Sequence, residues 1–108
     1  METRSEIDGG RGRLWLAGEM TIYEANTLQT TLMDVLDKCQ NLEVDLSGVT
    51  EIDTVGVQLL LLAKREAQAR GRQFRLSQHS RAVVGVFEIL NLSGLFGDPL
   101  VIPSAATA

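Results

Sequence analysis

The chain has 108 residues, of which 44% are hydrophobic and 22% are charged, and its formal net charge at pH 7 is −4. This length and balance are typical of one compact domain and exclude a disordered or fibrous chain. The longest unbroken hydrophobic run, Leu59 to Ala63, is far shorter than the roughly 20 residues that span a bilayer. The polar N-terminus lacks the hydrophobic segment of a secretory signal. We therefore expect a cytoplasmic protein without membrane insertion.

Charge and cysteine content narrow the class of protein further. The single cysteine, Cys39, cannot form an internal disulfide, which fits a reducing compartment. Six basic residues lie between Lys64 and Arg81. Such a cluster can bind nucleic acid, but aromatic residues are scarce and the sequence pI is about 4.9. A solvated helix end is the favoured interpretation, and no nucleic-acid partner is expected.

The first third of the chain predicts two strands and a helix. The alternation in "RLWLAG", Arg13 to Gly18, is typical of a strand, and "SEI" before the "DGGRG" turn can pair with it as a short hairpin arm. Thr21, followed three residues later by Glu24, predicts a capping box at the start of a helix. Hydrophobic residues then recur at threes and fours, which extends this helix to about Lys38, with Asn41 as a terminator.

A strand and a second helix follow. "LEVDLSGV" alternates hydrophobic and polar residues, so we expect a strand that ends near Leu46 and a loop over residues 47–51. The second helix is expected to begin near Thr54 and to end at Arg70. Gly71 can then supply the left-handed residue that closes many helices.

Three short elements complete the predicted fold. "QFRLSQ" predicts a fourth strand, "RAVVGVFEIL" a third helix capped by Ser80, and "LVIP" an edge strand that ends at Pro103. The alternating order predicts an α/β fold, in which helices pack against a small, mostly parallel β-sheet. We expect one domain over residues 1–108, with its core at about 13–102 and a frayed tail at 103–108.

Few residues could support catalysis. The chain has one histidine and one cysteine, and neither belongs to a recognisable catalytic constellation. His79 lies in the polar "SQHSR" segment, where a solvated side chain is expected, and Cys39 is expected in the core. No residues have metal-ligand spacing, and "DGGRG" lacks the lysine of a phosphate-binding loop. We therefore expect no enzyme activity, catalytic residue, metal or cofactor.

The segment "DLSGVTEIDTVG" is the strongest candidate for a functional site. It places Thr54 where a strand gives way to a helix, and the free N–H groups of a helix start favour negative charge. Gly56 carries no side chain, which would let a partner approach closely. Asp and Thr are also ordinary residues at helix starts, so spacing alone leaves a helix cap and a regulatory site both open.

Three segments together resemble a known family. "LAGEMT", "LEVDLSGVTEIDTVGVQLLLLAKREAQARGRQFRL" and "VFEILNLSGLF" are similar to the STAS domain of anti-sigma factor antagonists, from about Arg13 to Phe96. In that family the hydroxyl residue directly after the motif's aspartate is phosphorylated. The resemblance implies phosphorylation at Thr54, with Asp53 and Gly56 at their expected places. It also implies that the partner is an anti-sigma factor that acts as a protein kinase.

The sequence departs from the family pattern at three points. The usual acceptor serine is Thr54, the second hydroxyl residue is Val55, and the frequent Gly-Glu-Leu-Asp motif reads Gly18-Glu19-Met20-Thr21. Threonine keeps the hydroxyl group that phosphoryl transfer requires. The resemblance implies a partner-binding surface that consists of Gly18, Glu19, Met20, Thr21, Asp53, Thr54, Val55 and Gly56.

Two functions remain open. The favoured one is a regulatory protein that binds an anti-sigma factor/serine-protein kinase or a related sensor kinase, with a phosphatase for phospho-Thr54 as a further partner. Phosphorylation would add about −1.5 to −2 charges beside Asp53, Asp45 and Glu51, so a docked partner would face repulsion and desolvation. The alternative is a non-catalytic STAS subunit of a bacterial phospholipid-transport ABC complex, which stand-alone STAS domains with a similar Asp-Thr motif also resemble. A monomer or weak dimer is expected in either case.

Overall fold

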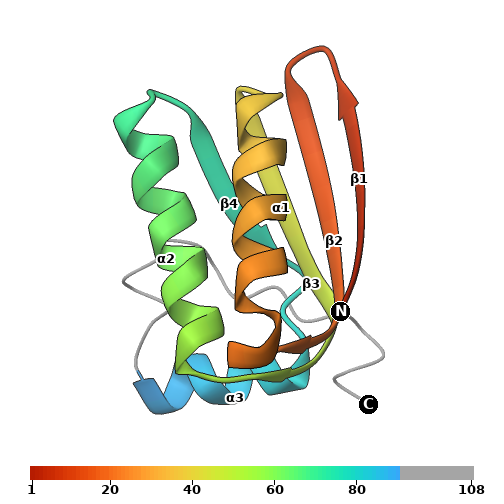
Figure 1. The fold of residues 1–108 in the computed structure, drawn as a ribbon, viewed down its shortest axis with the longest axis vertical. Coiled ribbons are helices and arrows are strands. Elements are labelled where there is room, and N and C mark those ends of the chain that lie inside the picture. The colour runs from red at the N-terminus through yellow and green to blue at the C-terminus, as the bar shows by residue number, and fades with distance from the viewer. Residues whose placement is uncertain (91–108) are drawn as a thin grey trace.

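The computed structural model describes residues 1–90, which form a four-stranded sheet with three α-helices and one short 3-10 helix (Figure 1). In chain order the elements are β1 (Glu2–Asp8), β2 (Arg11–Met20), η1 (Ile22–Glu24), α1 (Ala25–Asp37), β3 (Asn41–Ile52), α2 (Thr54–Ala69), β4 (Gln73–Ser77) and α3 (Arg81–Leu90). The predicted "LVIP" strand and the predicted tail at residues 103–108 lie outside the described residues.

The strands follow their sequence order across the sheet, β1-β2-β3-β4. β1 and β2 form an antiparallel hairpin, whereas β2, β3 and β4 are parallel neighbours joined through α1 and α2. In Figure 1, α1 and α2 lie side by side over the sheet, and α3 crosses the end of the sheet where the parallel strands finish. The predicted α/β fold with a mostly parallel sheet is confirmed.

β3 is longer than the sequence predicted, since it continues to Ile52 instead of ending near Leu46. The Ser47–Gly48 pair suggested a loop, but the β2–β3 register shifts between Trp15 and Ala17, and such a bulge absorbs an extra residue within a strand. A Cβ atom on Gly48 would lie 2.8 Å from the Cβ atom of Ala17. The glycine therefore permits close strand contact and marks no loop.

The capping box predicted at the start of the first helix is absent. Thr21 makes no side-chain cap, and its buried Oγ1 atom has no hydrogen-bond partner among the described residues. The Glu24 carboxylate instead accepts a hydrogen bond from the Met1 ammonium group at 3.3 Å. The chain first makes η1, and α1 begins only at Ala25.

Two of the other predicted helix ends are confirmed. Gly71 has a φ angle of +68° after α2, and the Ser80 hydroxyl accepts a hydrogen bond from the Val83 N–H at 3.3 Å before α3. Asn41 is no helix terminator, because α1 ends at Asp37 and Asn41 is already the first residue of β3.

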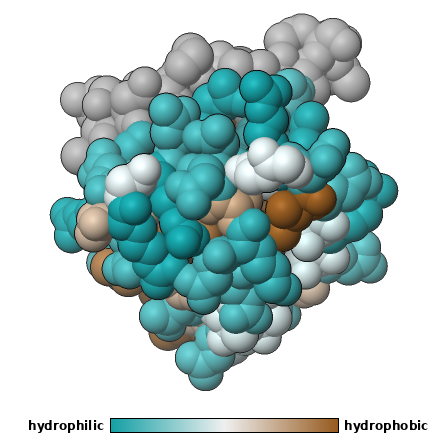
Figure 2. Space-filling model, turned by 90° about the horizontal axis from the view of Figure 1, so that it is seen from above, coloured by the Kyte–Doolittle hydropathy of each residue, from teal (hydrophilic) through white to brown (hydrophobic). Residues whose placement is uncertain are grey.

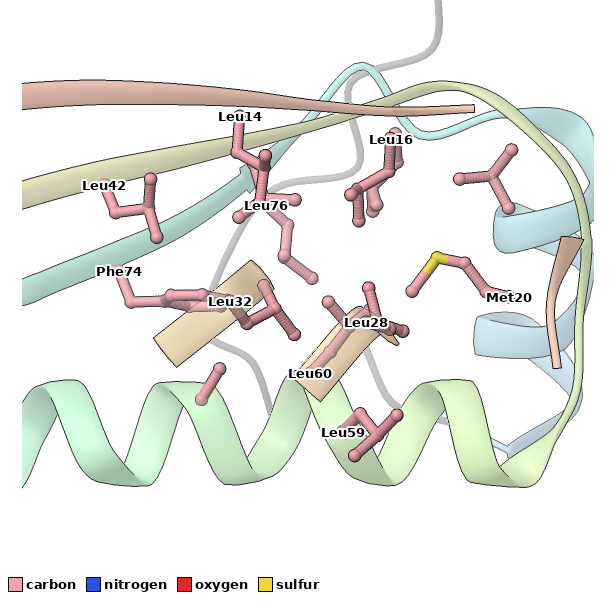
Figure 3. Packing of buried hydrophobic residues seen from close by; sticks show 14 of the residues in the cluster. Leu14, Leu16, Met20, Leu28, Leu32, Leu42, Leu59, Leu60, Phe74 and Leu76 are labelled. Carbon is pink, nitrogen blue, oxygen red and sulfur yellow. The ribbon is translucent and has the colours of Figure 1, made fainter. Parts of the chain in front are cut away.

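The core lies between the sheet and the two helices that cover it. Figure 3 shows leucine side chains of β2, β3 and β4 pointing toward those of α1 and α2. Members that are at most 1% exposed include Leu14, Leu16, Leu28, Leu32, Leu60 and Leu76. Cys39 also belongs to this core, as predicted, and burial raises the pKa of its thiol.

The prediction of a solvated His79 is wrong. Its side chain is only 1% exposed, and its ring meets the Phe87 ring edge-on with 5.7 Å between the ring centroids. Phe87 comes from α3, so the packing of this helix covers His79. His79 is therefore part of the α3 packing rather than of a loop exposed to solvent.

Candidate functional site

The two segments of the predicted site meet at one edge of the sheet. Because β2 and β3 are parallel, their carboxyl ends lie together, and the pairing brings Glu19 beside Glu51 and Met20 beside Ile52. The chain then leaves β3 through Asp53, whose N–H donates to the Met20 carbonyl oxygen at 3.2 Å. Residues 18–21 and 53–56, which the resemblance assigned to one surface, are thus neighbours in space.

Asp53 joins these segments through both of its carboxylate oxygens. Its Oδ1 atom accepts a hydrogen bond from the Gly56 N–H at 3.0 Å, which caps the start of α2. Its Oδ2 atom accepts one from the Ile22 N–H, also at 3.0 Å, and this bond reaches across to η1. One side chain therefore fixes the relative positions of η1 and α2.

Thr54 is the first residue of α2, and its side chain is exposed. Asp53 supplies the helix cap, so the Thr54 hydroxyl is not needed for that role. Val55 follows as a half-buried residue. The hydroxyl can be reached from solvent beside a helix start, where the free backbone N–H groups favour an anionic group. The Thr54 hydroxyl is therefore in a position where it could accept a phosphoryl group.

Gly56 has a role other than the predicted one. The residue is buried, and a Cβ atom at its position would lie only 2.4 Å from the Met20 carbonyl oxygen and 3.0 Å from Cγ1 of Ile52. The space beside Gly56 is therefore filled by the ends of β2 and β3. Its missing side chain allows α2 to pack against the strands.

The remaining predicted residues divide by exposure. Met20 and Thr21 are buried, Gly18 is half-buried with a φ angle of +102°, and Glu19 is exposed. Met20 belongs to the core, as Figure 3 shows. The side chains of Met20 and Thr21 thus support the surface from beneath, while Glu19 and Thr54 are available for contact.

Two exposed hydrophobic residues lie in η1, which Asp53 joins to the start of α2. Ile22 is 60% exposed and Tyr23 is 92% exposed, and both lie in η1. Tyr23 was not among the predicted site residues. Both residues precede the regularly spaced hydrophobic residues of α1, and this departure from the helical spacing is the signal in the sequence that could have identified them. We call the exposed residues at this end of the sheet the Thr54 surface, and they are Glu19, Ile22, Tyr23, Glu51 and Thr54.

Asp45, which was expected to make this surface more acidic, lies elsewhere. It occupies the middle of β3 on the side of the sheet away from α1 and α2, where it accepts a hydrogen bond from Arg13 Nη2 at 2.7 Å. Burial by itself would raise the pKa of Asp45, but hydrogen bonds from Ser47 and Arg13 outweigh burial and lower it. Asp45 is a structural ion-pair residue.

Several members of the basic cluster form ion pairs or hydrogen bonds with other residues of the same chain. Arg70 pairs with Glu66 at 2.8 Å and also with Asp37, and Arg72 donates to the Leu36 carbonyl oxygen. These contacts join the ends of α1 and α2 at the end of the molecule opposite the Thr54 surface. Figure 2 shows this opposite end, which consists mainly of hydrophilic residues. The contacts support the interpretation of the basic cluster as a helix end.

Residues 1–90 contain no group of three or more His, Cys, Asp or Glu side chains that could hold a metal ion. None of the helices in these residues is long and hydrophobic enough to cross a membrane.

Several solved structures have the same fold. An anti-sigma factor antagonist from Mycobacterium paratuberculosis superposes with a TM-score of 0.80 at 21% identity, covering 99% of this chain and 94% of that one. A putative anti-sigma factor antagonist from Thermotoga maritima gives 0.79 at 19% identity, with 97% and 90% covered. The phosphorylated form of the Bacillus cell fate determinant SpoIIAA gives 0.70 at 17% identity, with 98% and 96% covered.

The sequence itself matches a protein family. Among curated protein sequences, none matches this chain at a significant level. A family model described as "Mlab, STAS domain" matches residues 3–102, nearly the whole chain. The chain belongs to the STAS domain family, and its fold is that of the anti-sigma factor antagonists.

Proposed function

We propose that the protein is an anti-sigma factor antagonist, which binds an anti-sigma factor/serine-protein kinase or a related sensor kinase and is switched by phosphorylation of Thr54. The observation that carries the proposal is the exposed Thr54 beside Asp53, whose carboxylate holds η1 and α2 together. The similar folds of named antagonists, one of them in a phosphorylated form, support it. The protein acts in the cytoplasm, and a phosphatase restores the unmodified form.

The switch works through the cost of covering a charged group. A phosphate on Thr54 carries about −1.5 to −2 charges at neutral pH. The start of α2 tolerates this charge while water surrounds it. A partner that covers Thr54 must remove that water, and an unpaired charge at a closed interface is costly. The domain itself accepts the phosphate and contributes no catalytic group, so we propose that it is not an enzyme.

The description of the family model favours a second candidate function. It names Mlab, and the sequence already resembled the STAS subunit of bacterial phospholipid-transport ABC complexes. In that case the Thr54 surface would contact the ATPase of the complex, and the domain would be a permanent, non-catalytic subunit. A permanent subunit does not require a reversible modification, and this difference separates the two candidates.

Affinity capture with three immobilised baits distinguishes these functions. Wild type, Thr54→Ala and Thr54→Glu are exposed to extract from the native cell, and the captured proteins are identified by mass spectrometry. The proposal expects a kinase-type anti-sigma factor on wild type and Thr54→Ala, with much less on Thr54→Glu. The purified kinase should then place a phosphate on Thr54 of the wild type with ATP.

Two other outcomes have clear meanings. Capture of an ATPase together with a permease by all three baits would establish the second candidate. Capture of neither class, from an extract in which both are shown to be present, would contradict both candidates.

A further inference from the structure

The Thr54 surface has a hydrophobic part that is already held in place. Tyr23 and Ile22 are far more exposed than hydrophobic residues of a core, and such side chains are common anchors at protein interfaces. Their backbone is fixed at both ends of η1. The Ile22 N–H donates to Asp53 at 3.0 Å, and the Glu24 N–H donates to the Thr21 carbonyl oxygen at 2.9 Å. A partner therefore gains contact area at a low cost of ordering.

The same surface has two unpaired acids. Glu19 and Glu51 are register partners at the ends of β2 and β3, and both are exposed. Neither forms an ion pair with any described residue. Like charges on neighbouring strands repel each other. A cation supplied from outside the chain would relieve this repulsion, and the two carboxylates are suited to share one Lys or Arg side chain.

We infer that the Thr54 surface binds a protein segment that is both hydrophobic and basic. A hydrophobic side chain of the segment packs on Ile22 and Tyr23, and a Lys or Arg side chain lies between Glu19 and Glu51. The inference rests on the proposed function for the identity of the partner, an anti-sigma factor or kinase. The chemistry of the segment follows from the exposed side chains themselves, through complementary charge and shape.

The basic segment and the phosphate switch can act together, because they use different parts of the surface. Glu19 and Glu51 lie at the strand ends, whereas the chain runs from Thr54 into α2, away from those ends. A phosphate would be covered together with the hydrophobic part of the surface, beside Ile22, to which Asp53 is bonded. The phosphate lowers the affinity because it must lose its water when it is covered, and salt does not remove that cost. High salt should therefore not restore binding of the phosphorylated form.

Model peptides test the inference without a known partner. The probes are two synthetic 12-residue peptides that alternate phenylalanine or leucine with either lysine or glutamate. Their binding is followed by the backbone amide signals of the 15N-labelled protein in NMR titrations. The lysine peptide should shift the signals of residues 19–23 and 51. The glutamate peptide should leave them unchanged.

Matched variants separate local recognition from overall charge. Glu19→Lys/Glu51→Lys should weaken binding of the lysine peptide at least tenfold. The control Asp8→Lys/Asp34→Lys changes the net charge equally at two exposed acids that form no ion pair in the described part of the chain, and it should stay within twofold of wild type. Correct folding of each variant is checked by its amide spectrum.

The hydrophobic contact has its own matched pair of variants. Tyr23→Ala should weaken binding about fivefold or more, whereas Leu62→Ala, at a residue 48% exposed in the middle of α2, should have no effect.

Equal weakening by the two double charge variants, or unchanged binding by Tyr23→Ala, would overturn the inference. If the captured partner is no kinase but the peptide results hold, only the proposed function fails. If a kinase is captured but the peptides shift other residues, only the inference fails.

Discussion

Gly56 shows at the scale of one residue how tightly the start of α2 fits the sheet. A Cβ atom there would come within 2.4 Å of the Met20 carbonyl oxygen. Gly56→Ala must therefore displace the backbone of α2 or the backbone at the end of β2. We expect the free energy of unfolding to fall by about 2–3 kcal/mol, measured by urea denaturation. The matched control is Gly85→Ala in α3, where no atom of residues 1–90 outside the adjoining helix backbone lies within 4 Å of the added Cβ atom. That change should stabilise the protein by up to about 1 kcal/mol, and equal effects at both sites would refute the close contact.

Asp53 allows a second test at the same scale. Asn at this position keeps one oxygen, which can cap α2 or bind the Ile22 N–H but cannot do both in the present geometry. We expect Asp53→Asn to lower the free energy of unfolding by about 1 kcal/mol and to speed hydrogen exchange at the Ile22 amide. Asp53→Ala should show a larger loss. An Ile22 amide that exchanges equally slowly in both variants would show that the bond across the site has no role.

These residues also show what the sequence could reveal. Asp53 was recognisable as part of a helix start because a cap acts within three residues of the chain. Its second bond was not visible, since the two partners are 31 positions apart in sequence. The role of Gly56 was misread for a related reason. A glycine in the sequence reports a missing Cβ atom, but only the fold reports that Met20 fills the space.

At the scale of elements, β3 and its neighbours carry a row of charges across the side of the sheet away from α1 and α2. Arg13 pairs with Asp45 and lies 3.5 Å from Glu43, which Arg75 and Ser77 also contact. Burial would raise the pKa of Glu43, but hydrogen bonds from Ser77 and Arg75 prevail and lower it, as similar bonds do for Asp45. Both carboxylates are therefore harder to protonate in the folded protein than in the unfolded chain.

This row predicts how stability depends on pH. A lowered pKa contributes stability that is complete above the unfolded pKa and is lost as pH falls through the folded pKa. We expect a steady contribution at neutral pH and a decline that begins near the unfolded values of 4.5 for Glu43 and 3.8 for Asp45. Asp45→Asn should cost about 1–3 kcal/mol at pH 7, and its difference from wild type should shrink below pH 4. A difference that stays constant down to pH 3 in urea titrations would contradict this assignment.

The elements were predictable where their pattern was local. Helices α2 and α3 were placed correctly because spacing of hydrophobic residues, caps and Gly71 all lie within each segment. The end of β3 was misplaced because Ser47 and Gly48 look like a loop until their pairing with β2 is known. Strand length in a parallel sheet depends on a neighbour that is distant in sequence, and no local pattern records it.

At the scale of the whole molecule, the two ends differ in character. One end carries the Thr54 surface, and the other is hydrophilic and held by Arg70 and Arg72 (Figure 2). Thr54→Glu should therefore change binding and leave the fold intact, because the side chain is exposed and Asp53 supplies the cap. We expect dissociation constants for the captured kinase to rise about 5–30-fold, with Thr54→Ala close to wild type, in calorimetric titrations.

Salt provides the control for this prediction. Raising the ionic strength should weaken the binding of wild type, whose Glu19 and Glu51 we propose to attract the partner, but should not rescue Thr54→Glu. Equal affinities for wild type, both variants and the phosphorylated protein would reduce Thr54 to an ordinary first residue of α2.

The hydrogen bond between Ile22 and Asp53 also bears on the timing of protein synthesis. The ribosome releases β1, β2 and η1 well before Asp53, and the two bonded groups are 31 positions apart. Until β3 has paired with β2, η1 has no Asp53 to hold it. The first turn of α2, which includes Gly56, must emerge as well. A nascent chain that has folded only its first hairpin therefore presents no complete Thr54 surface, so the proposed partner and kinase could not engage it before the sheet has formed.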